Sequence, residues 1–399
     1  MGRSGHGPAR GRGGRAHRRG ARAAARVLLR RVSRWTRPAA RLGGPDVSPR
    51  ATAVGPLLRL RDGRDHRGRA LVIAVFGAGA IGCWVGGRLA AGGADVTLIG
   101  RARVMDELSD GLTTTELDGP PRSVRVTATT DPAAAAGATI VLVTVKSAQT
   151  AEAGATLAKV LPDGATVLSL QNGVRNPGVL RTALPGRRVL AAMVPWNVVR
   201  KERGSYHRGT TGVLMVEEAL EARPFAEALR AAGIAHELRS DITAVAWTKL
   251  VMNLNNAINA LAGVPLAEEL AQRDYRRVLA AAMREAMVAC RAANQPLAKL
   301  APVPTAWVPR ILESPDWMFR TIARRMLAVD PHARSSMWDD LEAKRTTEID
   351  YLQGEVLALA EKVGTPAPVN ALLVRLVREA ERGGRRDFSG AELRKLANV

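Results

Sequence analysis

A glycine-rich turn at residues 77–82 limits the folds open to this chain more than any other feature. An apolar, β-branched run over residues 71–76 leads into Gly77-Ala78-Gly79-Ala80-Ile81-Gly82. A stretch of small residues and a second apolar run over 94–99 follow. The order strand, G-x-G-x-x-G, helix, strand within about 30 residues is typical of dinucleotide-binding folds. We therefore predict that residues 77–82 bind a dinucleotide, with the pyrophosphate at the N-terminus of the helix.

The end of the second strand indicates which dinucleotide is bound. A carboxylate there would bind the ribose hydroxyls of NAD, but this strand ends in Ile99-Gly100-Arg101. A guanidinium suits the 2′-phosphate of NADP. The alternative is that Arg101 is simply one of the 51 arginines of the chain. We favour NADP(H) as the cofactor, with Arg101 as a phosphate ligand.

Two later strands continue the pattern of an α/β protein with a doubly wound sheet. Residues 139–145 run into Lys146, and residues 166–170 run into Gln171-Asn172-Gly173. Ligands of such sheets bind beyond the carboxyl ends of the strands. We therefore expect Lys146 and Asn172 beside the cofactor. For Lys146 the alternative is a solvated loop lysine.

The basic charge of the chain is concentrated at its N-terminus. The formal net charge is +22, and residues 1–70 supply +16 of it through nineteen arginines and three aspartates. This segment is too poor in apolar residues to fold, so we expect a disordered arm. It could bind nucleic acid or another anionic surface, or act as a transit peptide, although it lacks an amphipathic period. We favour a third interpretation, a non-functional extension translated from upstream of the true start, and consider nucleic-acid binding unlikely.

Cysteine content and hydropathy indicate the class of protein. With only Cys83 and Cys290 in 399 residues, a disulfide scaffold is excluded and a reducing compartment is favoured. Residues 70–87 are uncharged but contain five glycines in the pattern above, so we do not predict a membrane span. We also find no His/Cys cluster with metal-ligand spacing, and expect His207 in a loop or strand. A cytoplasmic, metal-free protein is expected.

From Asp241 onward the pattern becomes helical. Asp241 is a plausible N-cap for a helix over residues 242–259, on which Lys249, Asn253 and Asn256 form one polar stripe. A solvated face is the alternative interpretation. However, asparagine disfavours helix interiors. Lysine is also rare in this chain and, unlike arginine, can lose its proton when desolvated. These facts favour a catalytic role for Lys249.

The chain resembles the ketopantoate reductase (2-dehydropantoate 2-reductase) family over residues 71–399. Besides the glycine turn, the resemblance rests on Val143-Thr-Val-Lys146, Gln171-Asn172-Gly173, Trp247-Thr-Lys249-Leu-Val-Met-Asn253, Ser335-Ser336-Met337 and Thr347-Glu348-Ile-Asp-Tyr351. The resemblance leaves out residues 1–70, the basic arm that we expect to be disordered. A Rossmann domain that binds NADP would follow over 71–240, and an all-helical substrate domain over 241–399. The active-site cleft would lie between the two domains.

The resemblance also implies an NADPH-dependent reduction of a 2-keto acid, with ketopantoate in pantothenate and coenzyme A synthesis as the family substrate. A ketone that accepts a hydride needs a proton donor. By its match to the family, Lys249 is that general acid, and Glu348 holds the substrate hydroxyl; otherwise Glu348 is an exposed partner of Lys344. Other matches assign Asn253 and Ser336 to the substrate and Lys146 and Asn172 to the nicotinamide ribose. Ser335 could simply cap a helix.

Two departures put the substrate in doubt more than the reaction. Family asparagines fall on Ala257 and Ala333 here, and only Asn256 or Asn259 could replace the first of them. A shift of one residue turns a helical side chain by about 100°. A paralogous reductase acting on another 2-keto acid is therefore the alternative function. Apolar helix faces, such as residues 369–377, could pack internally or form a homodimer.

Overall fold

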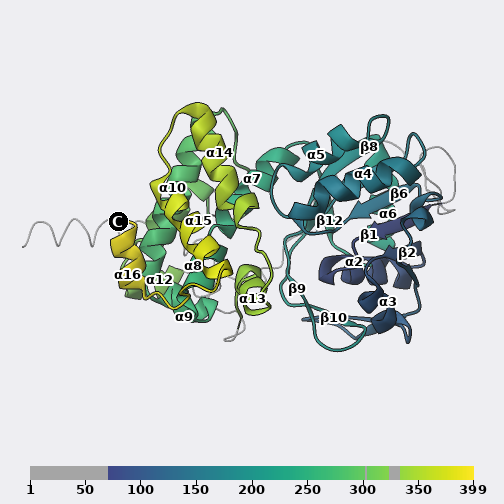
Figure 1. Cartoon of the computed structure of the whole chain (residues 1–399), viewed down its shortest axis with the longest axis horizontal. Coiled ribbons are helices and arrows are strands. Elements are labelled where there is room, and N and C mark those ends of the chain that lie inside the picture. Colours follow the sequence, from purple (N-terminus) through teal and green to yellow (C-terminus); the bar gives the residue numbers. More distant parts are fainter. Residues whose placement is uncertain (1–70, 302, 323–332) are drawn as a thin grey trace, which may run out of the picture. The chain divides into compact units, whose positions relative to one another are not determined.

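The computed structural model describes residues 71–301, 303–322 and 333–399 of the chain (Figure 1). The basic arm expected at residues 1–70 lies outside the described residues, so its predicted disorder and its possible binding roles stay predictions.

A large sheet forms the first half of the described chain. The four strands expected over residues 71–76, 94–99, 139–145 and 166–170 are present as β1, β2, β6 and β7. Within the described residues the sheet has eight strands in the order β12-β11-β8-β7-β6-β1-β2-β5. In chain order they are β1 (Val72–Phe76), β2 (Asp95–Ile99), β5 (Thr127–Thr129), β6 (Ile140–Val143), β7 (Thr166–Ser169), β8 (Arg188–Met193), β11 (Leu214–Glu217) and β12 (His236–Arg239).

The strand order confirms the predicted doubly wound, Rossmann-type sheet. The run β5-β2-β1-β6-β7-β8 is parallel throughout and corresponds to the order 3-2-1-4-5-6 of dinucleotide-binding sheets. Strand β11 is antiparallel to β8, and this reversal was not predicted. In this order β1 pairs with both β2 and β6, so the chain adds strands first on one side of β1 and then on the other. The glycine turn follows β1 directly, which places it at the topological switch point.

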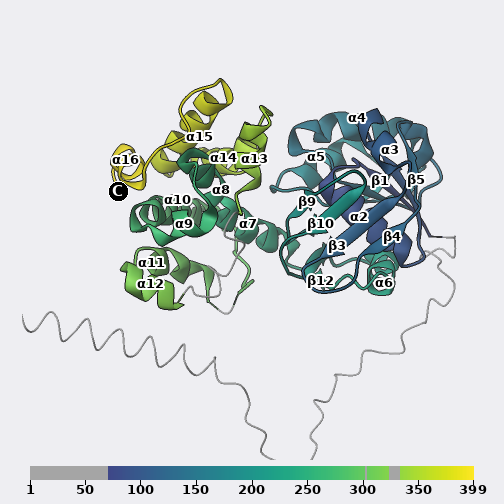
Figure 2. The same cartoon turned by 90° about the horizontal axis from the view of Figure 1, so that it is seen from below.

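Helices cover both faces of the large sheet, because successive apolar residues of a strand point to opposite faces and both faces must be buried. Ile73 and Val75 pack in one core cluster, whereas Ala74, between them, belongs to another. This alternation follows from the two-residue period of a strand. Helices α2 and α6 pack on the first face, and α4 and α5 on the second (Figure 2). Their bounds, with that of the short α3, are Ala80–Ala91 (α2), Ala102–Leu108 (α3), Thr150–Val160 (α4), Asn176–Ala183 (α5) and Arg223–Ala231 (α6).

A second, smaller sheet packs against α2 and was not foreseen from the sequence. In the part of the chain described, it has the strand order β4-β3-β10-β9, with β3 (Leu112–Glu116), β4 (Arg122–Val124), β9 (Val198–Arg200) and β10 (Ser205–Arg208). Trp84 of α2 meets Trp196 edge to face, with ring centroids 5.6 Å apart. The guanidinium of Arg208 lies over both rings and pairs with Glu116. His207 lies in β10, as a strand residue.

The second half of the described chain is helical, as expected. Its core brings together residues from α7, α8, α10, α14 and α15 (Figure 1). The helices are α7 (Ile242–Asn253), α8 (Asn255–Ala262), α9 (Leu266–Ala271), α10 (Arg273–Ala292), α11 (Val308–Leu312), α12 (Asp316–Ile322), α13 (Ser336–Glu342), α14 (Gln353–Val363), α15 (Pro368–Glu381) and α16 (Gly390–Leu396).

The prediction of a single helix over residues 242–259 is wrong, because the helix is interrupted at Leu254. The carbonyl of Leu254 accepts a hydrogen bond of 2.8 Å from Nε2 of the buried Gln353. A side chain inserted at a backbone carbonyl is a recognised cause of helix breaks. The break separates α7, which carries Lys249 and Asn253, from α8, which carries Asn256. The polar stripe therefore runs over two helices.

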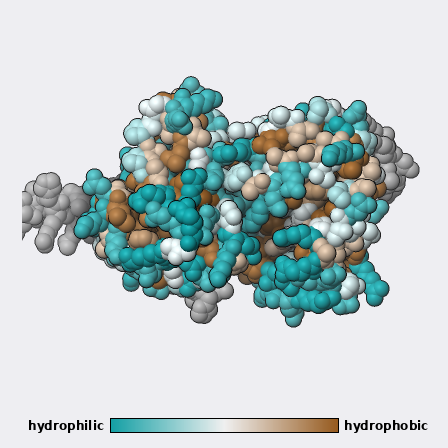
Figure 3. Space-filling model, in the orientation of Figure 1, coloured by the Kyte–Doolittle hydropathy of each residue, from teal (hydrophilic) through white to brown (hydrophobic). Residues whose placement is uncertain are grey.

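Further findings concern the surface, the cysteines and possible metal ligands. Figure 3 shows hydrophilic residues over much of one face, with apolar areas between them. Over the described ranges, no helix has the length and apolar character needed to cross a membrane. Both Cys83 and Cys290 are buried free thiols. Among the same residues, no group of three or more His, Cys, Asp or Glu side chains could hold a metal ion.

Candidate functional site

The glycine turn adopts the geometry that its sequence predicts. Gly77 has φ +112°, and a Cβ there would lie 2.6 Å from the backbone nitrogen of Val145. At Gly82 a Cβ would lie 2.5 Å from the carbonyl oxygen of Gly77. At Gly79, by contrast, the nearest atom to a Cβ would be 3.9 Å away. The first and third glycines are thus needed for packing within the protein, whereas the second leaves room for a ligand.

The end of β2 lies against this turn. The backbone N–H groups of Gly77 and Ala78 both donate to the carbonyl of Ile99. Arg101, two residues further on, is exposed, and its guanidinium has no hydrogen-bond or ion-pair partner among the described residues, whereas Arg103 pairs with Glu107. The open side of Gly79, the first N–H groups of α2 and a free guanidinium fit a phosphorylated dinucleotide.

Lys249 projects from α7 toward the ends of two strands of the large sheet. Its Nζ donates to Oδ1 of Asn172 at 2.7 Å and to the carbonyl oxygen of Val194 at 2.5 Å. Burial lowers the pKa of Lys249 from 10.5 to about 8, and the nearby negative charge of Glu348 acts in the opposite direction. An ammonium with such a pKa can give up a proton and regain it near neutral pH.

Glu348 lies directly before a short 3₁₀ turn (Ile349–Tyr351) and contacts the first half of the chain. One carboxylate oxygen accepts from the hydroxyl of Ser147 at 2.8 Å and from its backbone N–H at 3.2 Å. Burial raises the pKa of Glu348, but the charge of Lys146 and the hydrogen bonds from Ser147 and Asn172 outweigh it and bring the pKa below its usual value. Glu348 is therefore ionised and partly buried, and its partners do not include Lys344.

Asn172 joins the two predicted catalytic side chains. Its Oδ1 accepts from Lys249, while its Nδ2 donates to Oε2 of Glu348 at 3.3 Å. Its backbone carbonyl accepts from Nδ2 of Asn176 at 2.6 Å. These bonds fix the amide between a cation and an anion. The amide orientation follows from the chemistry, because only the oxygen can accept from an ammonium.

Lys146 also reaches a residue of the second half. Its Nζ lies 3.0 Å from Oδ2 of Asp340 on α13, and the other oxygen of that carboxylate pairs with Arg345 at 3.1 Å. The side chain of Lys146 is 51% exposed, whereas that of Asp340 is 3% exposed. Lys146 is therefore neither a buried residue nor the freely solvated loop lysine of the alternative interpretation.

The predicted substrate residues lie on three helices. Asn253 and Asn256 are partly buried, and their side chains have no hydrogen-bond partner among the described residues. Ser336 is exposed at the first position of α13. The neighbouring Ser335 caps that helix, since its hydroxyl accepts from the N–H of Trp338 at 3.2 Å. Ser335 thus has the capping role considered for it.

The structure also shows the surroundings of Asn259 and Ala257, two positions at which the chain was compared with the family pattern. Asn259 is fully buried, donates to Glu269 and to the carbonyl of Val264, and accepts from the N–H of Ser335. Its side chain is fully used and cannot replace a substrate ligand. Ala257 is also fully buried, in the apolar core of the second half. Of the two asparagines considered as substitutes, only Asn256 retains a side chain without a partner among the described residues.

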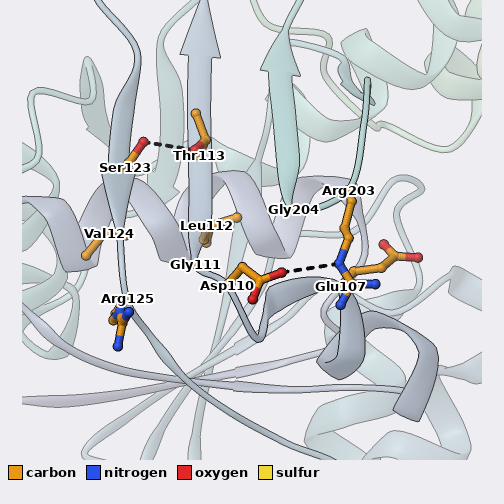
Figure 4. Close-up of a pocket in the computed structure, with 10 residues that line it drawn as sticks. All are labelled: Glu107, Asp110, Gly111, Leu112, Thr113, Ser123, Val124, Arg125, Arg203 and Gly204. Carbon is orange, nitrogen blue, oxygen red and sulfur yellow. Dashed lines mark hydrogen bonds and ion pairs between the residues drawn. The ribbon is translucent and has the colours of Figure 1, made fainter.

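A small pocket opens beside Lys249. Besides Lys249, it is lined by Ala192, Met193, Ala246, Leu250, Gln171, Asn172, Gly173 and Asn253, a mixture of apolar and amide side chains. A wider pocket lies elsewhere, on the small sheet, between Thr113, Ser123, Arg125 and Arg203 (Figure 4). None of its ten lining residues belongs to the predicted site, whereas Lys249, Asn172 and Asn253 line the smaller pocket.

Three residues of this site were missed by sequence reasoning: Ser147, Val194 and Asp340. Ser147 directly follows Lys146 at a strand end, a position that already indicated the site. Val194 acts through its carbonyl, which no side-chain pattern reveals. Asp340 lies four residues after Ser336, one helical turn along the same helix, and could have been found from that spacing.

Comparison with known proteins identifies the family. Residues 73–220 match the family described as ketopantoate reductase PanE/ApbA, and residues 241–381 match its C-terminal domain. The chain is 32% identical to 2-dehydropantoate 2-reductase of Halobacterium salinarum over 323 residues, which cover 78% of this chain and 99% of the relative. A relative from Archaeoglobus fulgidus with the same name is 29% identical over 317 residues, 78% of this chain and 98% of that one.

Solved structures agree with this result. The crystal structure of a PanE/ApbA family ketopantoate reductase from Ralstonia eutropha superposes with a TM-score of 0.69 at 31% identity, covering 78% of this chain and 99% of that one. D-mandelate dehydrogenase in its ternary structure with NADH and anilino(oxo)acetate shares the fold, with a TM-score of 0.63 at 20% identity over 78% of this chain and 99% of that one. The two family matches and the Halobacterium relative extend over most of the chain, which therefore belongs to the ketopantoate reductase family of oxidoreductases.

Proposed function

We propose that this protein reduces a 2-keto acid to a 2-hydroxy acid with NADPH, and that the substrate is ketopantoate. The observation that carries the proposal is the set of contacts Lys249–Asn172–Glu348. It holds an ammonium with a pKa of about 8 beside an ionised carboxylate. The names of the curated relatives support the choice of ketopantoate.

The residues that would hold NADPH are those of the first half. Gly79 and the N–H groups at the start of α2 would bind the pyrophosphate, and Gly77 and Gly82 allow the turn and the close packing of the helix that this requires. Arg101 would bind the 2′-phosphate through charge-assisted hydrogen bonds. Lys146 and Asn172, at neighbouring strand ends, would lie beside the nicotinamide ribose. When bound, NADPH supplies the hydride that reduces the ketone carbon.

Lys249 would act as the general acid. As negative charge develops on the ketone oxygen, its ammonium stabilises that charge and then transfers a proton to it. A group with a pKa of about 8 is roughly nine-tenths protonated at pH 7, so the reactive form dominates. Asn172 and the carbonyl of Val194 hold two of the three ammonium hydrogens, which leaves the third for the substrate.

The other polar groups would orient the keto acid. Ser336 would donate to its carboxylate, and Asn253 would supply amide hydrogen bonds from the wall of the small pocket. Asn256 is the third candidate for a substrate contact. Glu348 would accept a hydrogen bond from the substrate hydroxyl while its charge favours the protonated form of Lys249.

A reductase with a different 2-keto acid is the second candidate. It is favoured by Ala257, which is buried in the core, and by Ala333, since neither position offers an amide to the substrate. The apolar residues beside Lys249, which include Ala192, Met193 and Leu250, carry no polar group that would select ketopantoate over another branched keto acid.

The test is steady-state NADPH oxidation by the purified full-length protein with ketopantoate and with a panel of branched 2-keto acids. We expect turnover of ketopantoate, and a loss of about 100-fold or more in kcat for Lys249→Ala. Full activity of Lys249→Ala would refute its role as general acid. Turnover of another branched keto acid without turnover of ketopantoate would establish the second candidate instead.

A further inference from the structure

Asp340 is a buried carboxylate that lies between two cations. Its side chain is 3% exposed, and its two oxygens bind Lys146 at 3.0 Å and Arg345 at 3.1 Å. Arg345 also donates its backbone N–H to the carbonyl of Asp340 at 2.8 Å. A buried charge is costly unless its partners compensate it. Both oxygens of Asp340 have such partners, so the carboxylate is held in a fixed position.

Lys146, in contrast to the buried and fixed Asp340, has an exposed and flexible side chain. It follows β6, its side chain is about half exposed, and its flexible stem would leave the ammonium free to move in solvent. Among the described residues, Asp340 is its one ion-pair partner. The position of the Lys146 ammonium is therefore determined by a carboxylate on another element, α13, which begins at Ser336.

The next residue of the chain makes a parallel contact. Ser147 binds Glu348 through both its hydroxyl and its N–H. Two consecutive residues of the first half thus contact two carboxylates of the second half. Lys146 contacts Asp340 directly and acts on Glu348 through its charge. The ammonium of Lys146 lies within the electrostatic reach of both.

From this geometry we infer that Asp340 is a positioning residue, which holds the ammonium of Lys146 where it meets the cofactor. The inference rests on the proposed function in one respect, the placement of Lys146 beside the nicotinamide ribose. Asp340 itself would touch neither NADPH nor the keto acid. Because Ser336 begins the helix that carries Asp340, the contact also ties a cofactor residue to the helix of a substrate residue.

The experiment compares Asp340→Asn with Asp339→Asn in the full-length protein. Both changes remove one negative charge from α13, and both charges act near Lys146, but only Asp340 forms a hydrogen bond with it. We expect Asp340→Asn to raise the KM for NADPH by about fivefold to tenfold, with a change in kcat below about twofold, as the loss of one partly exposed charged hydrogen bond predicts. We expect Asp339→Asn to change the KM by less than about twofold.

A double-mutant cycle separates positioning from a general structural effect. In a Lys146→Met background, Asp340→Asn should leave the KM for NADPH unchanged, because the side chain that it positions is gone. Arg345→Gln removes the other partner of Asp340 and retains Lys146. It should therefore lower the Tm without raising the KM. Independent effects of Lys146→Met and Asp340→Asn on the KM would overturn the inference, as would equal effects of the two aspartate variants.

A failure of the proposed reaction can be distinguished from a failure of the role assigned to Asp340. NADPH binding is also measured by fluorescence titration, which needs no turnover. A wild type that binds NADPH but reduces no keto acid would refute the proposed reaction, while the same comparison of Kd values would still test Asp340. If Asp340→Asn fails to fold, the Arg345→Gln variant decides: a raised Kd for NADPH in a folded protein would contradict the assignment to the Lys146 contact.

Discussion

The pH dependence of kcat tests the proposed role of Lys249 directly. Burial holds its pKa at about 8, and the general acid must be protonated to react. The protonated fraction is about nine-tenths at pH 7, about one-half at pH 8 and about one-tenth at pH 9, from the Henderson–Hasselbalch relation. We therefore expect kcat to fall through a midpoint near pH 8 and then by about tenfold for each further pH unit.

A change at Glu348 should move this midpoint in a defined direction. The negative charge of Glu348 raises the pKa of Lys249 against the effect of burial. Glu348→Gln removes that charge and keeps the size of the side chain, so the pKa of Lys249 should fall and the midpoint should move to lower pH. The variant also loses a substrate contact and will be slower at every pH, but the position of the midpoint does not depend on the maximal rate.

The assay is NADPH oxidation at saturating ketopantoate from about pH 6 to about pH 10, a range that brackets the pKa of Lys249. Lys362, an exposed lysine of α14, supplies the control: Lys362→Ala should retain the wild-type profile. A midpoint that stays in place or moves to higher pH in Glu348→Gln would refute the electrostatic argument. An alkaline decline that persists in Lys249→Ala would show that another group titrates.

Three further predictions concern the glycine turn, the cofactor and a buried acid. Gly82→Ala should destabilise the protein by about 2 kcal/mol, because the new Cβ would lie 2.5 Å from a backbone oxygen, whereas Gly79→Ala should keep the wild-type Tm and raise the KM for NADPH. Calorimetry and kinetics on the pair check this, and a stable Gly82→Ala would contradict it. Arg101→Ala should raise the KM for NADPH by about tenfold to 100-fold and leave that for NADH unchanged; equal effects on both cofactors would exclude a 2′-phosphate contact. Burial raises the pKa of Glu269 from 4.5 to about 8, so its stabilising contribution is complete below about pH 4.5 and is lost as pH rises through about 8. The Tm of Glu269→Gln relative to that of the wild type should therefore increase from pH 5, about half a unit above the unfolded pKa, to pH 8, near the folded pKa. Thermal denaturation of both proteins at the two pH values checks this, and an unchanged Tm difference would show that the carboxyl does not titrate.

Much of the first half could be predicted from local sequence. The turn at Gly77 and Gly82 and the order of strand and helix around it depend on residues close together in the chain, where backbone sterics and alternation decide the outcome. Strand ends of a parallel sheet meet at one edge, so the positions of Lys146 and Asn172 near the turn also followed from sequence. The small sheet did not, since β3 pairs in parallel with β10, and about ninety residues separate the two strands.

The site itself was decided by tertiary structure. Sequence reasoning selected Lys249 and Glu348, but the residue between them is Asn172, which had been placed at the cofactor alone. The low pKa of Lys249 requires burial against the carbonyl of Val194, and the fixed position of Lys146 requires Asp340. The sequence by itself thus determined the turn, the strands and the helix around it, and the types of reactive group. Only the folded chain decided which of these groups share a hydrogen bond and how far each is buried, because both depend on contacts between residues far apart in the chain.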